Sequence, residues 1–539
     1  MTSACITRQA TLGDYLDLLA GQDLVASTCN FDPSHANLAV HFATADSREV
    51  VAHTLFVCKG RAFKEEYLIS AAQTGAVAYV SEVEYPQAGI PGILVTDIRR
   101  AMGLMADYLY MHPCARTQVC ALTGTKGKTT SAYYLRAILN TQLALDAEAS
   151  CTTTEGALPT STDTSGATEP ASASQSTPIF TSVLLDDGIT AGQSKLTTPE
   201  AFELERHLAN AVSVGAPRVV MEISSQALKY DRCFGIEFAV AALTNVGEDH
   251  ISPIEHPDFE DYLTSKLKIF GRCQSAVVNL DADHANRILD AATQAPQVIT
   301  FSMRNPKADV YASNLRRSDQ GITATVRTPR FQQDVLFPTP VEFNVANALC
   351  AITMAEALGV SQQAICSGFG NVSVPGRMQL LPTKSGQVIG VIDYAHNGMS
   401  LEALLHDLKA NYPDRSVCVV FGATGGKGVD RRVTMGNVAG RLADRIVITE
   451  DDPGPEDPAD IARTIAECVQ AQGNANWQIV LNRDEAIATA VEQTPKQGQK
   501  TLLVVTGKGH ETFMLRKNGS EPREADHVVL RRELDKAGF

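Results

Sequence analysis

The feature that most constrains the fold is the stretch 123–130, which reads TGTKGKTT. An apolar run at 119–122 precedes it and predicts a buried strand, and residues 131–139 have the pattern of a helix. A glycine-rich turn between a strand and a helix directs backbone N–H groups toward an anion, and the helix N-terminus adds partial positive charge. Lys128 can reach terminal phosphates and the Thr129 hydroxyl can bind Mg²⁺. The stretch predicts a nucleotide site, although Leu122 stands where the usual spacing has its first glycine.

Composition excludes several classes of protein. A net charge of −15 argues against a nucleic-acid partner. The twelve cysteines include no C-x-x-C pair, so they predict reduced thiols in a cytoplasmic protein and neither a disulfide framework nor a zinc site. The N-terminus has no apolar core typical of a signal peptide, and no run of about 18 apolar residues predicts a membrane span.

The pattern of strands and helices predicts an α/β protein with three domains. Residues 1–116 alternate short strands and helices and predict a small N-terminal α/β domain. Residues 117–374 predict a central P-loop domain with a doubly wound sheet, and residues 375–539 predict a C-terminal Rossmann-like α/β domain. The segment 148–177 is rich in Ser, Thr, Ala and Pro, so we expect a disordered insert there, either a passive loop or a lid.

Polar side chains follow several predicted strands. Glu222 lies in the apolar run 219–223, where a carboxylate is costly unless it is paired or binds a metal, so we predict a Mg²⁺ ligand. Another strand leads to the polar segment 245–250, at the strand end where open α/β sheets bind ligands. Strands that end at 393–397, 450–454 and 507–511 predict a second doubly wound sheet.

Several of these residues also have ordinary structural interpretations. Thr198 is suited to cap a helix that begins at Pro199. By composition alone, Lys266 and Lys268 are solvated positions of a helix over 259–270, and Asn344 is suited to a helix cap. The glycine turn 422–428 could bind phosphate, but one such turn is weak evidence.

The motifs taken together resemble the Mur ligase family over nearly the whole chain except the insert. They are, in order, TGTKGKTT, LTTPE, MEISSQAL, TNVGEDHISPIEHPDFEDYLTSK, FNVANA, VPGRMQ, DYAHN, DDPGPEDP and TGKGHE. Within the family the chain is most similar to the branch that adds the third residue of the peptidoglycan stem peptide. KGRAFKEEYL and GEDHISPIEHP look most like the lysine-adding members.

The resemblance implies an ATP-dependent ligase. ATP would activate the D-Glu γ-carboxylate of UDP-MurNAc-L-Ala-D-Glu as an acyl phosphate, and the incoming amine would displace phosphate to form an amide. The implied cofactors are ATP and Mg²⁺. The implied partners are the nucleotide dipeptide and a diamino acid, with L-lysine favoured, for a cytoplasmic monomer.

The resemblance also implies roles for particular residues. The catalytic set would be Lys128, Glu222, His250 and Lys266. Metal would be held by Thr129, Glu222, His250 and Lys266, the last as N6-carboxylysine, because a protonated lysine cannot bind Mg²⁺. ATP would be held by Gly124, Thr125, Lys126, Gly127, Lys128, Thr129, Thr130, Asn344, Asn347, Arg377 and Asp393. The UDP-MurNAc-dipeptide would be held by Ser47, Thr197, Thr198, Ser224 and Arg232.

The implied amino-acid pocket comprises Arg432, Asp451, Asp452, Gly454, Lys508 and Glu511. The diaminopimelate-adding branch has Asp-Asn-Pro-Arg where this chain has 451–454, and its arginine pairs with the distal carboxylate of diaminopimelate. Gly454 cannot make that charge-assisted pair, whereas Asp451 and Glu511 suit a distal ammonium. Gly-Lys-Gly-His-Glu at 507–511 nevertheless resembles the diaminopimelate branch. Ornithine differs from lysine by one methylene, worth about 1–3 kcal/mol, so it stays an alternative.

Three other classes of protein share part of this pattern. A sister ligase, such as folylpolyglutamate synthetase or the D-Ala-D-Ala-adding ligase, would share the ATP site, but 451–453 and 507–511 argue against both. A non-catalytic ATP-binding partner protein would not need Lys128, Glu222, His250 and Lys266 together. A P-loop motor or transporter ATPase would hydrolyse ATP without an amino acid.

Overall fold

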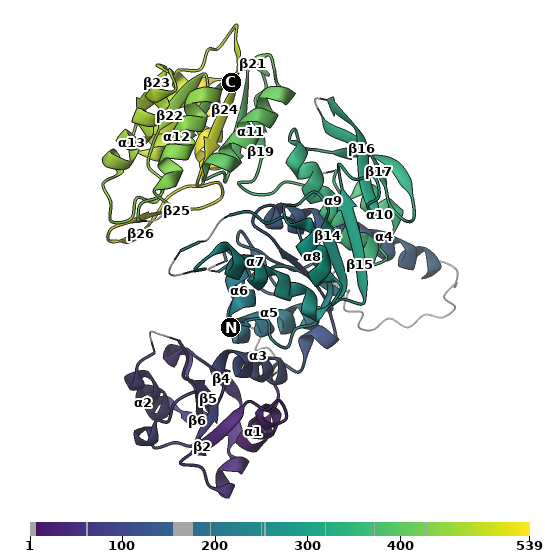
Figure 1. Ribbon diagram of the computed structural model, residues 1–539, viewed down its shortest axis with the longest axis vertical. Helices are drawn as coiled ribbons and strands as arrows, with labels where there is room; N and C mark the ends of the chain where they lie inside the picture. The colour runs from purple at the N-terminus through teal and green to yellow at the C-terminus, as the bar shows by residue number, and fades with distance from the viewer. Residues whose placement is uncertain are drawn as a thin grey trace, which may run out of the picture. The chain divides into compact units, whose positions relative to one another are not determined.

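The computed structural model describes residues 7–60, 63–154, 176–194, 196–248, 251–252, 255–318, 320–370, 372–426 and 428–539, with the backbone alone at 151–154. The described chain forms two compact units. The first comprises Met1–Ser313, Thr325–Gln333 and Asn347–Phe369, and the second comprises Asn314–Ala324, Asp334–Ala346 and Gly370–Phe539. Figure 1 shows that both units mix helices with sheets, which confirms the predicted α/β class. The predicted domain boundaries at 116 and 374 stay a prediction.

The N-terminal part of the first unit is a mainly parallel sheet with the strand order β2-β7-β6-β5-β4. Only the pairing of β2 with β7 is antiparallel among the strand pairs described in this sheet. A small ladder of β1 and β3 lies apart from it. The elements are β1 (Ala10–Thr11), α1 (Leu12–Ala20), β2 (Val25–Cys29), η1 (Pro33–Asn37), β3 (Ala39–Val40), β4 (Phe42–Thr44), η2 (Ser47–Glu49), β5 (Thr54–Val57), α2 (Glu65–Thr74), β6 (Ala76–Ser81), η3 (Pro86–Ala88), β7 (Gly92–Val95), α3 (Ile98–Leu109) and η4 (Pro113–Ala115).

A larger sheet follows, with the order β11-β10-β9-β12-β8-β13-β14-β15-β16-β17-β18. From β9 to β16 its described pairings are parallel, as buried apolar strands joined by helices require. The strands are β8 (Gln118–Thr123), β9 (Ile179–Phe180), β10 (Leu185–Asp186), β11 (Ala191–Gly192), β12 (Arg218–Glu222), β13 (Phe238–Leu243), β14 (Cys273–Asn279), β15 (Gln297–Ser302), β16 (Val310–Ser318), β17 (Gly321–Arg327) and β18 (Gln332–Phe337).

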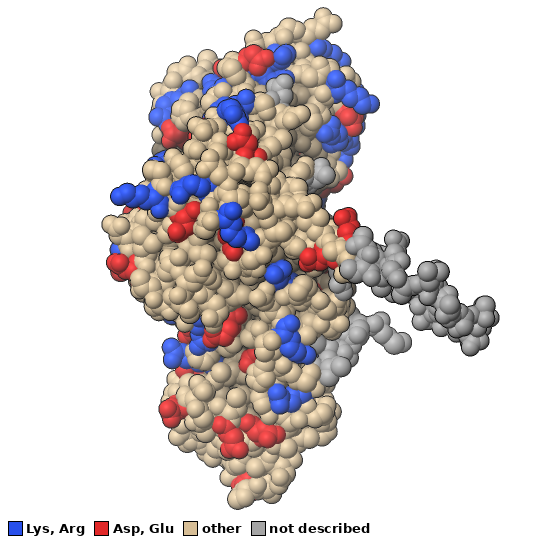
Figure 2. Space-filling view, turned by 90° about the vertical axis from the view of Figure 1, so that its right-hand side faces the viewer, with Lys and Arg blue, Asp and Glu red and all other residues tan. Residues whose placement is uncertain are grey.

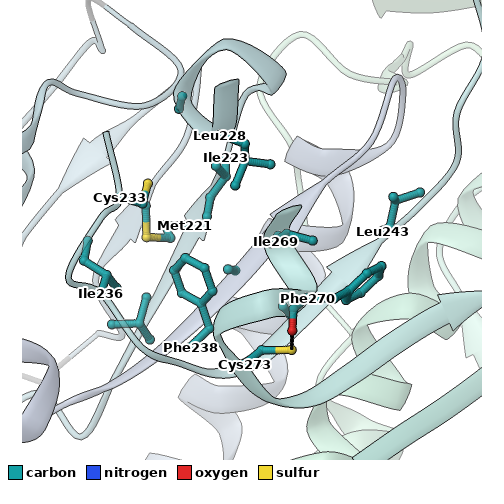
Figure 3. Close-up of a cluster of buried hydrophobic side chains, with 14 of the residues drawn as sticks. Met221, Ile223, Leu228, Cys233, Ile236, Phe238, Leu243, Ile269, Phe270 and Cys273 are labelled. Carbon is teal, nitrogen blue, oxygen red and sulfur yellow. Dashed lines mark hydrogen bonds between the residues drawn. The ribbon is translucent and has the colours of Figure 1, made fainter. Parts of the chain in front are cut away.

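Helices cover this sheet, and one of its cores is drawn in Figure 3. Apolar side chains from β12, β13 and η5 meet there, among them Met221, Phe238 and Phe270. The Cys273 thiol donates to the Phe270 carbonyl at 3.6 Å. The helices are α4 (Lys128–Thr154), α5 (Ala201–Ser213), α6 (Ser225–Lys229), α7 (Phe259–Leu267), η5 (Lys268–Arg272), α8 (Ala285–Ala292), α9 (Glu342–Ala357) and α10 (Gln362–Ser367).

The second unit contains a sheet with the order β19-β20-β24-β21-β22-β23, parallel from β20 to β23. Val417 and Val419 face α11, α12 and α13, which lie together in Figure 1, whereas Cys418 and Val420 face α14 and α15. This alternation is the predicted doubly wound arrangement. The elements are β19 (Gln379–Pro382), β20 (Val388–Asp393), α11 (Gly398–Asn411), β21 (Arg415–Phe421), α12 (Asp430–Leu442), β22 (Arg445–Ile448), α13 (Pro458–Ala471), β23 (Trp477–Ile479), α14 (Arg483–Glu492), β24 (Lys500–Thr506), β25 (Phe513–Arg516), β26 (Gly519–Pro522) and α15 (Asp526–Ala537).

The predicted disordered insert differs from the structure at its two ends. Helix α4 continues to Thr154, so residues 148–154 are helical. At the other end Thr177 is buried, and its backbone N–H donates to Asn140 on α4 at 2.7 Å. Arg136 on the same helix donates to the Thr177 carbonyl at 2.8 Å. These polar contacts with α4 order the end of a segment that lacks large apolar residues, and 155–175 lie outside the described residues.

The surface carries both signs of charge. Figure 2 shows Lys and Arg interspersed with Asp and Glu over the visible face, with wide uncharged areas between them. Within the described ranges, no helix is both long enough and apolar enough to cross a bilayer.

Glu205 on α5 gives a prediction about pH. Its side chain is buried, and among the described residues neither carboxyl oxygen has a hydrogen-bond partner. Burial, and secondarily the nearby Asp107, raise the pKa of Glu205 well above its ordinary value. The folded state therefore prefers the neutral acid, and this contribution to stability is fully present below the unfolded pKa of about 4.3. Above that pH we expect a loss of about 1.4 kcal/mol per pH unit until the folded pKa is reached.

The measurement is the free energy of unfolding in urea, followed by circular dichroism from pH 4 upward. Glu205→Gln keeps the shape and cannot ionise, so its stability should lack this pH-dependent loss. Identical pH profiles for wild type and Glu205→Gln would contradict the assignment.

Candidate functional site

The loop between β8 and α4 has the shape that the sequence predicted. Gly124 and Gly127 have φ angles of +153° and +84°, which side chains rarely allow. A Cβ at Gly127 would overlap Asn347 Oδ1, and one at Gly124 would overlap Thr244 Oγ1. Both glycines are therefore required by backbone conformation and by close neighbours.

Lys128 begins α4 and lies over this loop. Its Nζ donates to the Gly124 carbonyl at 2.8 Å and to the Thr125 carbonyl at 3.4 Å. The ammonium thus lies at the N-terminus of a long helix, where the helix dipole and the first backbone N–H groups also favour an anion. The arrangement is suited to bind phosphate.

Oxygen atoms gather beside the loop. Glu222 ends β12, is 1% exposed and is paired in register with Leu122 of β8. Its Oε1 accepts from the Ser182 backbone N–H at 3.3 Å, and the Ser182 and Thr129 hydroxyls lie 3.4 Å apart. One carboxylate and two hydroxyls are hard oxygen donors of the kind that Mg²⁺ prefers, so the residues fit that ion. In the described chain no group of three His, Cys, Asp or Glu side chains forms a metal site, and His250 lies outside the described residues.

A buried histidine joins α6 to α7. His256 Nδ1 lies 2.6 Å from Asp261 Oδ2, and its Nε2 lies 2.9 Å from the Ser225 hydroxyl. Asp261 also pairs with Lys229 at 2.7 Å. Chiefly because of burial, the pKa of His256 is lowered. This network fixes the start of α6, which directly follows Ser224, against the helix that carries Lys266.

The residues predicted to hold the nucleotide dipeptide form a second network. The Thr198 hydroxyl donates to the Glu222 carbonyl at 3.1 Å and accepts from the Ser224 backbone N–H at 3.0 Å. Arg232 donates to the Thr198 carbonyl at 3.2 Å and pairs with Glu200 at 3.0 Å. The alternative role for Thr198 is wrong, because α5 begins at Ala201 with Glu200 at its N-cap and has no side-chain cap.

The N-terminal part contributes Lys59, whose Nζ pairs with Glu200. Positive charge from Lys59 and Arg232 holds the pKa of Glu200 below its usual range, although burial opposes it. Ser47 lies in η2, and none of the contacts described for it reaches this network. Thr197 is half-buried beside Thr198.

In the second unit, charged side chains gather where β22 and β24 end. Lys508 is fully buried and pairs with Asp452 at 2.8 Å and with Glu511 at 2.5 Å. Glu511 also accepts from the Tyr394 hydroxyl at 2.8 Å. Asp452 has a φ of +44°, an uncommon conformation for a residue with a side chain. The strand ends thus bring together two acids and one cation from distant positions in the sequence.

A buried ion pair supports this cluster. Arg483 and Asp526 are 1% and 0% exposed in their side chains, and Nη2 lies 2.8 Å from Oδ2. Arg483 also donates to the Thr506 carbonyl at 2.6 Å. Burial raises the pKa of the neighbouring Asp451 to about 6, against the opposing effect of Arg483. A Cβ at Gly507 would overlap Asp451 Oδ2, so the glycine leaves space for that carboxyl group.

The remaining predicted residues of this unit make contacts of their own. Arg432 pairs with Glu456 at 2.7 Å. Arg377 stacks 4.1 Å above the Tyr394 ring. The carboxylate of Asp393 accepts the backbone N–H groups of 378 and 395 at 2.8 Å each, and Asn344 donates to Thr339 at 3.2 Å.

Comparisons with known proteins identify the family. The Mur ligase middle domain matches residues 122–355, and the Mur ligase glutamate ligase domain matches residues 376–509. UDP-N-acetylmuramoyl-L-alanyl-D-glutamate--L-lysine ligase of Enterococcus faecalis is 34% identical over 535 residues, covering 96% of this chain and 98% of the relative. The chain belongs to the Mur ligase family. The ligase of the same name from Streptococcus thermophilus is 34% identical over 474 residues, 87% of this chain and 88% of that one.

A solved structure agrees with this assignment. The structure of a UDP-N-acetylmuramoyl-L-alanyl-D-glutamate--2,6-diaminopimelate ligase has a TM-score of 0.65 and 25% identity, covering 95% of this chain and 98% of that one. The predicted fold class of this Mur ligase is therefore confirmed.

Lys266 contradicts the interpretation from composition. It is 2% exposed, its Nζ donates to the Gly124 carbonyl at 2.9 Å, and it lies 4.6 Å from the centre of the Tyr262 ring. The Tyr262 hydroxyl in turn lies 3.0 Å from Thr125 Oγ1. A lysine four positions from an aromatic residue on one helix face can be buried with it, which composition does not reveal. Lys268 is exposed, as expected.

Several residues of the site were missed by sequence reasoning. Ser182 follows a short strand end beside the phosphate loop, and that position is the signal that could have found it. His256 and Asp261 carry a weaker signal, five positions apart at the start of a helix. Arg483 begins α14 and has no sequence signal, because its partner Asp526 is distant in the sequence.

Proposed function

We propose that this Mur ligase joins the γ-carboxylate of UDP-MurNAc-L-Ala-D-Glu to the amine of L-lysine, with ATP as the energy source, in the cytoplasm. The observation that carries the choice of amino acid is the charged cluster of the second unit, where Asp452 and Glu511 both pair with Lys508. The two relatives at 34% identity carry the same specificity in their names.

The phosphate loop is the proposed ATP site. Residues 124–130 would surround the phosphates, with Lys128 neutralising the charge that develops during transfer. We assign Asn344, Asn347, Arg377 and Asp393 to adenine, phosphate and ribose. The γ-carboxylate would attack the terminal phosphorus of ATP, releasing ADP and leaving an acyl phosphate.

Mg²⁺ held by Thr129 and Glu222, with a second ion held by His250 and carbamylated Lys266, would supply charge neutralisation between two anionic reactants. Carbamylation adds CO₂ to the neutral Lys266 amine with loss of a proton, which converts a cation into a carboxylate. The buried position of Lys266 beside Gly124 supports this assignment, because a carboxylate there would lie next to the phosphate loop.

The dipeptide site is proposed on the network of Thr198, Ser224 and Arg232, with Ser47 and Thr197. Arg232 and Lys59 supply positive charge, although both now pair with Glu200. An anionic substrate would compete with Glu200 for them.

The amino-acid site is proposed on Arg432, Asp451, Asp452, Gly454, Lys508 and Glu511. A diamino acid brings a carboxylate, which suits Arg432 or Lys508, and a distal ammonium, which suits the acids. The attack of its α-amine on the acyl phosphate forms a tetrahedral intermediate that collapses to the amide and phosphate.

The test is phosphate release from ATP with UDP-MurNAc-L-Ala-D-Glu, adding L-lysine, L-ornithine or meso-diaminopimelate in turn. We expect release that requires both the nucleotide dipeptide and L-lysine. Phosphate release with ornithine but not with lysine would identify ornithine as the amino acid that is added. Release without any amine would favour a motor or transporter ATPase, and ATP binding without release would favour a non-catalytic partner protein.

Gly454→Arg should raise the use of meso-diaminopimelate relative to lysine, because it places a guanidinium where the distal carboxylate would bind. The first side-chain atom meets no obstacle, since a Cβ at Gly454 has nothing within 4 Å. Its φ of +59° is unfavourable for arginine, so stability should fall by about 1–2 kcal/mol. The measurement is kcat/KM for each amino acid.

Gly454→Ala is the matched control, because it carries the same backbone strain without a guanidinium. Its ratio of diaminopimelate to lysine use should equal that of the wild type. An unchanged ratio in Gly454→Arg would show that the pocket is placed wrongly.

A further inference from the structure

An arginine already lies beside the proposed amino-acid pocket, and a neighbouring acid holds it. Both terminal nitrogens of Arg516 pair with the Glu450 carboxylate, at 2.6 and 2.7 Å. Glu450 is 7% exposed and directly precedes Asp451. Arg516 also pairs with the exposed Glu521 through its Nε at 2.7 Å.

The β25–β26 hairpin fixes Arg516 next to Gly454. The Leu515 backbone N–H donates to Asp452 Oδ1 at 2.7 Å, and the Gly454 N–H donates to the Leu515 carbonyl at 3.0 Å. Gly454 and Arg516 are themselves paired across an isolated parallel bridge. The guanidinium therefore originates from the strand that lines the segment 452–454.

This placement matters for selectivity. A guanidinium whose N–H groups are free can bind a carboxylate through two hydrogen bonds. It would therefore favour an amino acid with a distal carboxylate and repel one with a distal ammonium. With Glu450 occupying these N–H groups, the three acids Asp451, Asp452 and Glu511 outnumber the one cation that pairs with two of them, Lys508. The remaining negative charge suits an ammonium.

We propose that Glu450 is a specificity-determining residue, which selects a diamino acid with a distal ammonium by occupying Arg516. The inference rests on the proposed function and adds to it the residue that prevents this chain's own arginine from binding a second carboxylate. Glu450 acts through Arg516 and is a positioning residue.

The experiment compares kcat/KM for meso-diaminopimelate and L-lysine in the wild type and in Glu450→Gln. The amide has the same shape but no charge, so Arg516 loses its ion-pair partner. We expect the ratio of diaminopimelate to lysine use to rise by about tenfold, while lysine-dependent turnover persists. An unchanged ratio overturns the proposal.

Two variants make the test specific. Glu521→Gln removes the exposed partner of Arg516 and should leave the ratio unchanged. In Glu450→Gln combined with Arg516→Met, the ratio of diaminopimelate to lysine use should return to the wild-type value, because the guanidinium is absent. The proposal is overturned if Glu521→Gln raises the ratio of diaminopimelate to lysine use by the same factor. It is also overturned if the raised ratio persists in the double variant.

Arg516→Met alone keeps the proposal testable if Glu450→Gln does not fold. Because Arg516 is occupied in the wild type, its removal should leave the ratio unchanged, and a fall in diaminopimelate use would contradict the proposal. A wild type that uses no diamino acid refutes the proposed function, whereas lysine use with a ratio that Glu450→Gln does not move refutes only the role of Glu450.

Discussion

Lys266→Ala is expected to lower amine-dependent phosphate release by at least about 100-fold, the size of effect seen when one preorganised charge is removed from an active site. Short carboxylic acids such as acetate should partly restore turnover, because they can occupy the space of the lost carbamate and supply a metal-binding oxygen. Lys266 is 2% exposed, so its truncation to alanine removes buried atoms. The measurement is the rate of phosphate release against acetate concentration.

Lys268→Ala is the matched control, since Lys268 lies two positions away and is exposed. The hydrogen bonds described for its ammonium go to backbone carbonyls at the C-terminal end of α6. It should keep full turnover. Full turnover of Lys266→Ala without added acid would refute the carbamate. Loss of turnover with no rescue by acid would instead assign Lys266 the role of a cation that holds the Gly124 carbonyl.

Arg483→Met is expected to lower the free energy of unfolding of the second unit by about 3 kcal/mol, because it removes the main partner of the buried Asp526. The loss stays at the low end for a broken buried pair because Arg523 still pairs with Asp526 at 2.9 Å. Asp451 would also lose a neighbouring cation, so its pKa should rise further above about 6. Trp477, the single tryptophan of the chain, lies on β23 of that unit, so its fluorescence in urea reports the relevant transition.

Arg441→Met supplies the comparison. Arg441 pairs with Glu402 at a similar distance of 2.9 Å, but both side chains are about half exposed. Such a pair contributes about 0–1 kcal/mol, so the variant should unfold almost as the wild type does. If both variants lost the same free energy of unfolding, the buried Arg483–Asp526 pair would contribute no more to stability than the exposed pair.

The features that could be predicted from the sequence are those that depend on residues close together in the chain. The strand–glycine–helix order fixed the phosphate loop, and Glu222 could be placed at a strand end because a carboxylate in an apolar run is informative. The parallel sheets followed from apolar runs that alternate with helices. These inferences need only neighbouring residues.

The parts that could not be predicted depend on contacts between distant segments. Lys508 is buried because Asp452 and Glu511 surround it, and a lysine in a glycine-rich turn gives no sign of that. Arg516 is held by an acid 66 positions earlier, and the hairpin that presents it adopts its position through backbone bonds to the 452–454 segment. Composition likewise assigned Lys266 to solvent, although it lies against the phosphate loop.

The discontinuity of the second unit limits how the chain can be divided. Val341 packs in the same core as Met378, Leu401 and Val417, although it precedes the predicted boundary at 374. The polypeptide crosses between the two units several times between 313 and 370. A fragment that begins at 375 would thus leave a gap in its own apolar core, so a faithful dissection of this ligase needs a circularly permuted chain or two co-expressed pieces that retain 334–346.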